Sequence, residues 1–163
     1  MLVRNIKLIV YDFDGVMTDN KIILREDGLE SVTVNRSDGL AVGVFKRRGI
    51  PQMILSTERN KVVAERAKKL DIPVLQDVPD KCEALKIYCR DTNIPLKDVV
   101  YVGNDLNDLE AMRIVGHPVC PANACKEAKA VAKIVLNTTG GEGVLRELLY
   151  YVKTDEDRKR NRR

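Results

Sequence analysis

Residues 6–18 read IKLIVYDFDGVMT. The run is mostly apolar up to Tyr11 and then reaches Asp12 and Asp14, which a glycine follows. A short apolar run that stops at polar residues and glycine is typical of a strand buried in a parallel sheet. In such sheets, ligands bind beyond the carboxyl ends of the strands. The stretch therefore predicts an α/β fold with Asp12 and Asp14 at the edge where a site would form.

The remaining sequence alternates between short apolar runs and segments with apolar residues at helical spacing. Further strands are expected at 53–55, 73–75, 99–102, Val119 and 134–136, and helices at 38–48, 60–70, 81–90, 108–115, 126–132 and from the glycine-rich turn at 140–143 to Tyr150. Residues 21–24 and 31–34, joined by a turn at Asp27-Gly28, predict a β-hairpin. We therefore expect a doubly wound, Rossmann-like, mainly parallel sheet with helices on both faces. Ser37 is the expected N-cap of the first helix.

Groups that suit phosphate chemistry follow the predicted strands. Besides Asp12 and Asp14, they are Ser56-Thr57 after the second strand, Lys81 at the start of a helix, and Gly103-Asn104-Asp105-Leu106-Asn107-Asp108 after the fourth strand. They supply a nucleophilic carboxylate, a second carboxylate, a hydroxyl, a cation and oxygen ligands, which phosphoryl transfer to a carboxylate requires. Each alone has an ordinary explanation, such as a helix cap, but their meeting at one sheet edge predicts an active site.

These segments resemble, in order and spacing, the four motifs of the haloacid dehalogenase superfamily, and the resemblance covers residues 6–150. It implies that Asp12 attacks phosphorus and becomes an aspartyl phosphate, and that Asp14 protonates the leaving alkoxide and then activates water. It also implies that Ser56 and Lys81 hold the phosphate oxygens. The implied cofactor is Mg²⁺, a hard ion that prefers oxygen ligands, bound by Asp12, the main-chain carbonyl of Asp14 and the fourth motif.

The fourth motif departs from the Gly-Asp-Asp version that is common in this superfamily, because position 104 is Asn. Either the amide oxygen of Asn104 replaces a carboxylate ligand or Asp105 binds the metal, and the sequence leaves both open. Asp108 is expected to support the ligands rather than to bind the ion. With one negative charge fewer, the metal is expected to bind somewhat more weakly.

The room for a cap over the active site is small. Only residues 19–37 separate the first motif from the next helix, which is enough for a hairpin flap but not for a cap domain. A neighbouring subunit would then close the site, and the hairpin would pair across subunits, since two isolated strands are barely stable. The resemblance is thus to capless members, and we expect a homo-oligomer, in particular a tetramer.

Two further segments narrow the resemblance, Ser37-Asp38-Gly39-Leu40 and GGEGVLRE at residues 140–147. They are similar to the small tetrameric phosphatases of 3-deoxy-octulosonate 8-phosphate and of nine-carbon, sialic-acid-type 9-phosphates. The same fold forms the C-terminal domain of some acylneuraminate cytidylyltransferases. The expected substrate is therefore a phosphorylated keto-deoxy sugar acid.

The expected recognition residues favour the nine-carbon acid. Octulosonate enzymes tend to carry Arg before Asp-Gly and Ser-Gly-Arg after the second strand, where this chain has Ser37 and Ser56-Thr57-Glu58. Glu58, Arg66 and Lys69 resemble instead the recognition set of the nine-carbon branch, and Thr57 lies beside them. Arg66 and Lys69 share a helix face and would hold a substrate carboxylate across a subunit interface, although a solvated helix face explains their spacing equally well. Arg146 is expected at an interface or at the substrate.

Composition agrees with one domain and excludes other classes of protein. Of the 163 residues, 44% are hydrophobic, which is enough for one core, assigned to residues 1–152. The sequence has no apolar run that could cross a membrane and no recognisable signal peptide, so a cytoplasmic protein is expected. Residues 153–163 hold six basic and three acidic side chains, out of a net charge of +4. This tail is expected to be disordered, and the nearly neutral remainder argues against nucleic-acid binding.

A second hypothesis comes from another class of protein. The chain would then be a phosphatase-like module that organises an oligomer with little or no catalysis. Asn104 and the relation to a synthetase domain suggest it, whereas an intact set of catalytic groups argues against it, namely Asp12, Asp14, Ser56 and Lys81.

Overall fold

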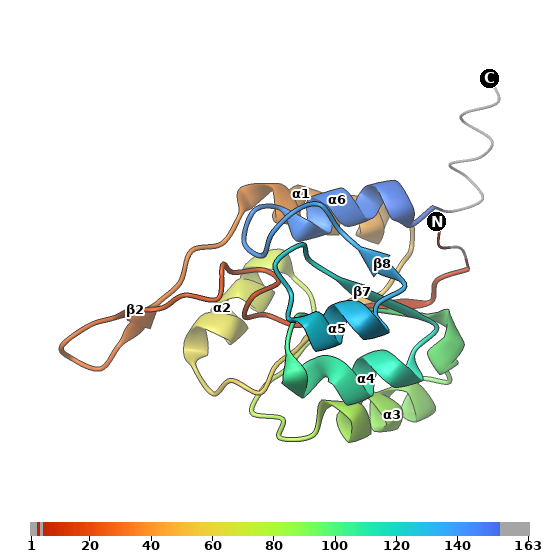
Figure 1. Ribbon diagram of the computed structural model, residues 1–163, viewed down its shortest axis with the longest axis horizontal. Coiled ribbons are helices and arrows are strands. Elements are labelled where there is room, and N and C mark those ends of the chain that lie inside the picture. The colour runs from red at the N-terminus through yellow and green to blue at the C-terminus, as the bar shows by residue number, and fades with distance from the viewer. Residues whose placement is uncertain (1–2, 4, 154–163) are drawn as a thin grey trace.

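The computed structural model describes Val3 and residues 5–153, and it is built around one parallel sheet (Figure 1). The six strands run in the order β5-β4-β1-β6-β7-β8. They are β1 (Leu8–Tyr11), β4 (Gln52–Leu55), β5 (Val74–Leu75), β6 (Val99–Val102), β7 (His117–Cys120) and β8 (Ile134–Val135). All pairings are parallel, and β1 lies between β4 and β6. The strand order reverses at β1, so the predicted doubly wound sheet is confirmed.

Helices cover both faces of the sheet (Figure 1). One face carries α1 (Arg36–Arg47), α2 (Lys61–Leu70) and α6 (Val144–Tyr151), and the other carries α3 (Lys81–Asp91), α4 (Leu109–Ile114) and α5 (Lys126–Val131). Two short 3₁₀ helices, η1 (Leu96–Asp98) and η2 (Leu106–Asp108), precede β6 and α4. Every helix expected from the sequence is present, within a few residues of its expected bounds.

The strands send alternate side chains into two apolar layers, because neighbouring side chains of a strand point to opposite faces. In β1, Ile9 and Tyr11 enter the layer under α1, α2 and α6. Leu8 and Val10 enter the layer under α3, α4 and α5. All four side chains are completely buried. The sequence of β1 is therefore apolar on both faces, as a strand at the centre of such a sheet must be.

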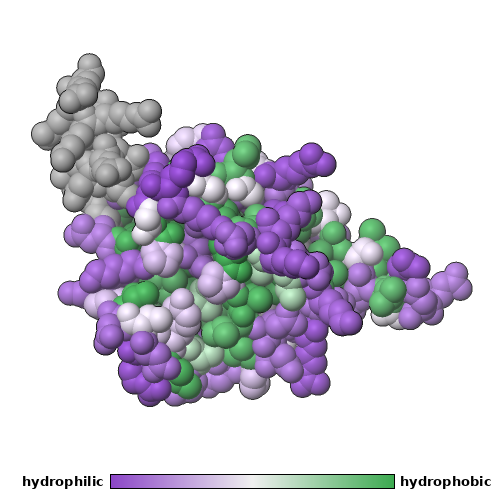
Figure 2. Space-filling model, turned by 180° about the vertical axis from the view of Figure 1, so that it is seen from behind, coloured by the Kyte–Doolittle hydropathy of each residue, from purple (hydrophilic) through white to green (hydrophobic). Residues whose placement is uncertain are grey.

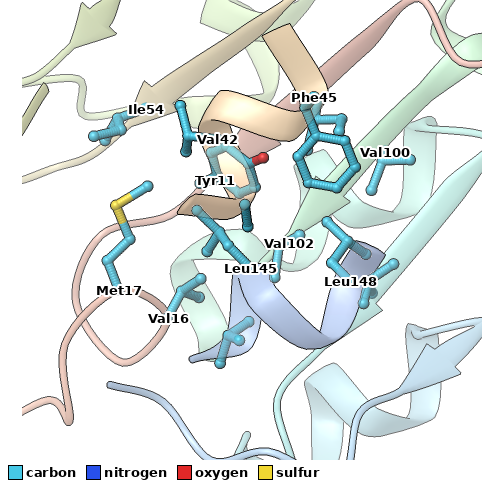
Figure 3. Close-up of a cluster of buried hydrophobic side chains, with 14 of the residues drawn as sticks. Tyr11, Val16, Met17, Val42, Phe45, Ile54, Val100, Val102, Leu145 and Leu148 are labelled. Atoms are coloured by element: carbon cyan, nitrogen blue, oxygen red, sulfur yellow. The ribbon is translucent and has the colours of Figure 1, made fainter. Parts of the chain in front are cut away.

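The loop after β1 is anchored in the same core. Val16 and Met17 are completely buried, and Figure 3 shows them in one cluster with Leu145 of α6 and Val102 of β6. Burial of a side chain of this size stabilises the fold by about 1.5–3 kcal/mol. The loop that carries Asp12 and Asp14 is therefore held at one end by β1 and at the other by its own apolar residues.

The first helix begins earlier than expected, and Ser37 is not its N-cap. Asn35 holds that position, where its Oδ1 accepts hydrogen bonds from Ser37 N at 2.9 Å and from Ser37 Oγ at 2.8 Å. Asn and Ser are similarly good caps, so residue type does not distinguish them. Asn35 prevails because its backbone is extended, which turns its side chain toward the first free amides of the helix.

The predicted hairpin is present as an arm that projects from the body (Figure 1). β2 (Ile23–Leu24) pairs antiparallel with β3 (Glu30–Ser31), and a bridge between Thr18 and Val34 closes the base of the arm. Among the described residues between β1 and α1 there is this arm and no cap domain. The arm exposes Ile23 by 64% and Leu24 by 66%, and Figure 2 shows apolar residues gathered on it.

The tail expected at residues 153–163 is described only at Lys153, whose backbone N donates to Val3 O at 3.1 Å. The expected disorder of residues 154–163 concerns a part that lies outside the described residues. Within the described part of the chain, each helix is too short or too polar to cross a bilayer.

Candidate active site

Asp12 lies at the carboxyl end of the central strand, where the chain turns sharply. Its backbone N donates to Val102 O at 2.9 Å, which extends the pairing of β1 with β6 by one residue. The turn places Gly15 at a φ of +81°, which favours glycine. A Cβ on Gly15 would also lie 2.1 Å from the amide nitrogen of Asn104. The missing side chain therefore lets Asn104 approach the loop that carries Asp12 and Asp14.

Lys81 forms buried ion pairs with two carboxylates. α3 begins at this residue, and its Nζ donates to Asp12 Oδ1 at 2.7 Å and to Asp108 Oδ1 at 2.8 Å. Lys81 is 2% exposed, and Asp108 is completely buried. Asp108 also accepts hydrogen bonds from the Tyr101 hydroxyl and from Asn104 N, both at 2.8 Å. Because the three buried charges have partners, they fix the position of the Asp12 carboxylate.

The electrostatics of this cluster favour the charged lysine more than the charged nucleophile. Burial raises the pKa of Asp12 to about 7, and Asp108 adds to the rise, whereas Lys81 opposes it. For Lys81, burial alone would lower the pKa, but the two carboxylates outweigh this effect and the pKa rises. Lys81 therefore keeps its charge at neutral pH, and a further cation beside Asp12 would favour the ionised form of its carboxyl.

Asp14 differs from Asp12 because it is partly exposed. Burial raises the pKa of its carboxyl, and the charge of Glu58 adds to the rise. Lys81 lowers this pKa, and Glu30 raises it again. A carboxyl with a raised pKa retains a proton closer to neutral pH, which suits a proton donor.

Three oxygens converge beside this cluster in a way that fits Mg²⁺. The side-chain oxygen of Asn104 lies 2.9 Å from the main-chain oxygen of Asp14 and 3.0 Å from Oδ2 of Asp12. An amide oxygen at these distances is repelled by both acceptors unless a cation lies among them or the amide turns so that its nitrogen donates to both. In an octahedral Mg²⁺ site with bonds of about 2.0–2.1 Å, adjacent oxygens are about 2.9 Å apart. The donor set and its spacing therefore fit this ion.

Asp105 does not share this arrangement. Its side chain is exposed, and its Oδ1 accepts a hydrogen bond from Leu106 N at 2.8 Å at the start of η2. Of the two alternatives in the fourth motif, the structure turns Asn104 toward Asp12 and Asp14. Among the described residues, no three His, Cys, Asp or Glu side chains come together as a metal site. The converging oxygens belong instead to one carboxylate, one main-chain carbonyl and one amide.

A cavity of about 540 Å³ adjoins these groups. Asp12, Asp14 and Asn104 line it, and so do Thr57 and Glu58, which the sequence analysis proposed as substrate contacts. Ser56 and Lys81, proposed as contacts of the phosphate oxygens, are only 1% and 2% exposed and are not among the lining residues. The Oγ of Ser56 accepts a hydrogen bond from Glu58 N at 3.1 Å, so Ser56 also holds the turn that presents Glu58.

Four polar residues of the cavity wall were not predicted from the sequence as site residues: Asn20, Glu30, Asn60 and Asn107. Asn60 carried a signal, because it is the first residue of the helix predicted at 60–70, where a capping residue is expected. Asn107 also carried one, because it belongs to the fourth motif. Glu30 carried none, since only the folding of the arm beside α2 brings it to the cavity.

Three residues expected to bind substrate lie away from this cavity. Arg66 is almost completely buried, and with Lys69 it borders a second cavity of about 350 Å³, which shares Glu30 with the first. Arg146 is exposed on α6, where its guanidinium lies 5.7 Å from the centroid of the Tyr150 ring. Within one chain, none of the three is among the residues that line the cavity at Asp12.

Comparison with known proteins identifies the class of this protein. The chain belongs to the haloacid dehalogenase-like hydrolases, whose family model matches residues 49–148. More closely, it is related to 3-deoxy-D-manno-octulosonate 8-phosphate phosphatases. The one from Yersinia pestis is 31% identical over 155 residues, which are 94% of this chain and 83% of that protein.

A longer relative shares only part of its length with this chain. N-acylneuraminate cytidylyltransferase A from Danio rerio is 25% identical over 149 residues, which are 90% of this chain but 35% of that protein. The chain thus spans about a third of that relative, in agreement with the resemblance to one domain of such enzymes.

Solved structures give the same family. A protein from Streptomyces avermitilis, assigned to the HAD family of hydrolases, is 42% identical with a TM-score of 0.91, over 93% of this chain and 88% of that one. The 3-deoxy-D-manno-octulosonate 8-phosphate phosphatase from Moraxella catarrhalis is 34% identical with a TM-score of 0.85, over 88% of this chain and 83% of that one. The latter was solved in complex with magnesium, phosphate and the sugar acid.

Proposed function

We propose that the protein is a Mg²⁺-dependent phosphatase that hydrolyses the phosphomonoester of a keto-deoxy sugar acid. Its family and its phosphatase relatives make it a phosphoric monoester hydrolase. The observation that carries the finer proposal is the cluster at the end of β1. There Asp12 binds buried Lys81 through one carboxylate oxygen, and the Asn104 amide lies close both to the other oxygen of Asp12 and to the Asp14 carbonyl.

Asp12 is the proposed nucleophile. Its carboxylate attacks phosphorus to form an aspartyl phosphate, and the bond between phosphorus and the substrate oxygen breaks. Asp14 donates a proton to the departing alkoxide and then takes a proton from the water that hydrolyses the intermediate. Lys81 orients Asp12, and together with Ser56 it is the proposed contact of the phosphate oxygens.

The proposed metal ligands are Asp12, the main-chain carbonyl of Asp14 and Asn104, with Asp108 positioning Asn104 through its backbone N. Mg²⁺ at this point supplies positive charge, which favours the ionised nucleophile and offsets the charge of the phosphate. The magnesium and phosphate in the related Moraxella catarrhalis structure support this choice of ion.

A nine-carbon acid 9-phosphate is the favoured substrate, and octulosonate 8-phosphate comes next. Thr57 and Glu58 in the cavity wall support the nine-carbon acid, whereas the names of the phosphatase relatives support the octulosonate. None of the described residues that line this cavity is a Lys, Arg or His, so a cation for the substrate carboxylate must come from elsewhere. Arg66 and Lys69 of a second subunit are the proposed source, with Arg146 at the interface or at the substrate.

A homo-oligomer, in particular a tetramer, is the proposed assembly. The arm exposes four large apolar residues, each by at least half, which are Ile22, Ile23, Leu24 and Leu29. A projecting apolar hairpin of two-residue strands is poorly stabilised alone, and a second copy would cover it. A cytoplasmic location stays a prediction.

The decisive experiment measures phosphate release by the purified protein from the nine-carbon and eight-carbon acid phosphates, with and without Mg²⁺. We expect Mg²⁺-dependent turnover, which Asp12→Asn abolishes. Asp19→Asn is the matched control, because Asp19 lies in the same segment but does not line the cavity. If neither acid phosphate is hydrolysed while the protein forms a stable tetramer, the oligomerisation module without catalysis becomes the better description.

A further inference from the structure

The wall of the active-site cavity is strongly acidic. Five carboxylates line it, and no Lys, Arg or His is among the described residues that do so; the five are Asp12, Asp14, Glu30, Glu58 and Asp105. Asp12 and Asp14 belong to the proposed reaction, and Asp105 accepts the hydrogen bond that begins η2. Glu30 has no assigned role, although its charge is felt at Asp14.

Glu30 is held firmly even though it comes from the projecting arm. Its Oε2 accepts a hydrogen bond from Asn60 Nδ2 at 2.8 Å, where the arm passes beside α2 (Figure 1). Asn60 is the N-cap of α2, and its Oδ1 accepts from Val62 N at 3.1 Å. The helix therefore orients the amide of Asn60, and the amide orients Glu30. Among the described residues, no donor reaches the other carboxylate oxygen of Glu30, which leaves it for a ligand.

A fixed carboxylate in a wall without cations recognises hydrogen-bond donors. Hydroxyl groups suit it, because hydrogen bonds from a hydroxyl to a carboxylate are short and about twice as strong as those between neutral groups. A second anionic group beside the phosphate would be repelled by Glu30, Glu58 and Asp105. The substrate carbons next to the phosphate should therefore bear hydroxyls, and any acid group should lie farther away.

We propose that Glu30, positioned by Asn60, is a specificity-determining residue that accepts hydrogen bonds from the hydroxyls of the substrate's polyol chain. The inference rests on the proposed function, since it assumes that the phosphate lies at Asp12. It adds a residue of the arm to the selection of substrate. It also requires that the substrate present hydroxyls, and not a bare alkyl chain or an ammonium, to this wall.

The test compares three phosphomonoesters with six-carbon chains: a hexitol 6-phosphate, n-hexyl phosphate and 6-aminohexyl phosphate. kcat/KM is measured with Mg²⁺ for the wild type and for Glu30→Gln. The matched control is Glu26→Gln, the same change at an exposed residue of the same arm that does not line the cavity. We expect the wild type to prefer the hexitol ester over the hexyl ester. In Glu30→Gln this preference falls about ten- to hundred-fold, and in Glu26→Gln it stays at the wild-type value.

A second variant tests the role of Asn60. Asn60→Asp keeps a good helix cap but removes the donor to Glu30 and sets two carboxylates against each other. We expect the preference for the hexitol ester to fall here too. The readout is a ratio between two substrates, so a merely structural fault, which lowers both rates together, leaves it unchanged.

Three results would overturn the proposal. The first is a Glu30→Gln variant that loses activity equally on the hexitol and hexyl esters, or loses none. The second is a wild-type preference for the aminohexyl ester that depends on Glu30, because the carboxylate would then select ammonium. The third is a wild type that hydrolyses the acid phosphates but shows no Mg²⁺-dependent turnover of the hexitol ester, because the polyol chain would then not be recognised at this wall. If the acid phosphates are not hydrolysed either, the proposed function itself is overturned and the inference with it.

Discussion

Replacing Gly140 with alanine tests whether the glycine-rich loop before α6 holds the nucleophile loop in place. Gly141 N donates to Val16 O at 3.1 Å, and Gly140 N donates to Asn123 Oδ1 at 2.8 Å. A Cβ on Gly140 would lie 2.1 Å from Gly15 O and 2.8 Å from Thr18 O. These oxygens belong to the backbone of the loop that carries Asp12 and Asp14, so no flexible side chain can move aside.

The size of the effect follows from these distances. A carbon and a carbonyl oxygen approach to about 3.3 Å, so a contact of 2.1 Å requires the two loops to separate by about 1.2 Å. Overpacking of this kind costs about 1–3 kcal/mol of unfolding free energy, or roughly 2–4 °C in Tm for each kcal/mol at this chain length. A shift of about 1 Å in a catalytic group lowers the rate about a hundredfold.

The assay measures kcat with saturating substrate and Mg²⁺, together with the Tm, for Gly140→Ala and a matched control. The control is Gly39→Ala within α1, where the nearest atom to the new Cβ is a flexible Leu70 side-chain carbon at 3.5 Å. We expect kcat to fall about a hundredfold in Gly140→Ala and to stay unchanged in the control. An unaltered kcat in Gly140→Ala, with its Tm lowered or not, would refute the reasoning that the two loops are coupled.

Three further predictions concern the metal, the core and the arm. Asn104→Asp adds a negative charge to the metal ligands, so Mg²⁺ should bind about tenfold more tightly in calorimetry. The metal-free variant should have a lower Tm, because the new carboxylate cannot donate to the oxygens that face it. An unchanged Mg²⁺ affinity would contradict Asn104 as a ligand. Burial raises the pKa of Asp38 from 3.8 to about 6, although hydrogen bonds from Arg146 N and Leu145 N lower it. The contribution of Asp38 to the free energy of unfolding is therefore full below about pH 4 and is lost as the pH rises to about 6. The loss is at most about 3 kcal/mol. Asp38→Asn should remove this slope from denaturant unfolding measured between pH 4 and 7, and an equal slope in both proteins would assign it to other groups. Ile23→Asp puts a charge on the apolar arm and should dissociate the proposed oligomer in light scattering without lowering the helix content. A variant that is as large as the wild-type oligomer would exclude the arm from the interface.

Much of the architecture could be predicted because it depends on local patterns. The apolar run that ends at Asp12 is a buried strand wherever it occurs, and amphipathic spacing at 61–70 and 81–91 makes helices that must cover the sheet. The strands of a parallel sheet end at one edge, so a carboxylate after β1 and polar residues after β4 and β6 had to lie near one another. Even so, Asn35 and not Ser37 caps α1, because two good capping residues lie two positions apart and the backbone conformation selects between them.

The sequence by itself determined which chemical groups reach the sheet edge, since strand ends and helix starts are set by neighbours a few residues away. Only the tertiary structure shows that Asn104, and not Asp105, turns toward the loop of Asp12 and Asp14, because that direction depends on contacts with a loop about ninety residues earlier in the chain. The same holds for Glu30, which joins the cavity through a hydrogen bond to a residue thirty positions away, and for Arg66, which the packing of α2 buries away from Asp12. Side-chain direction is a property of long-range packing, and no local pattern encodes it.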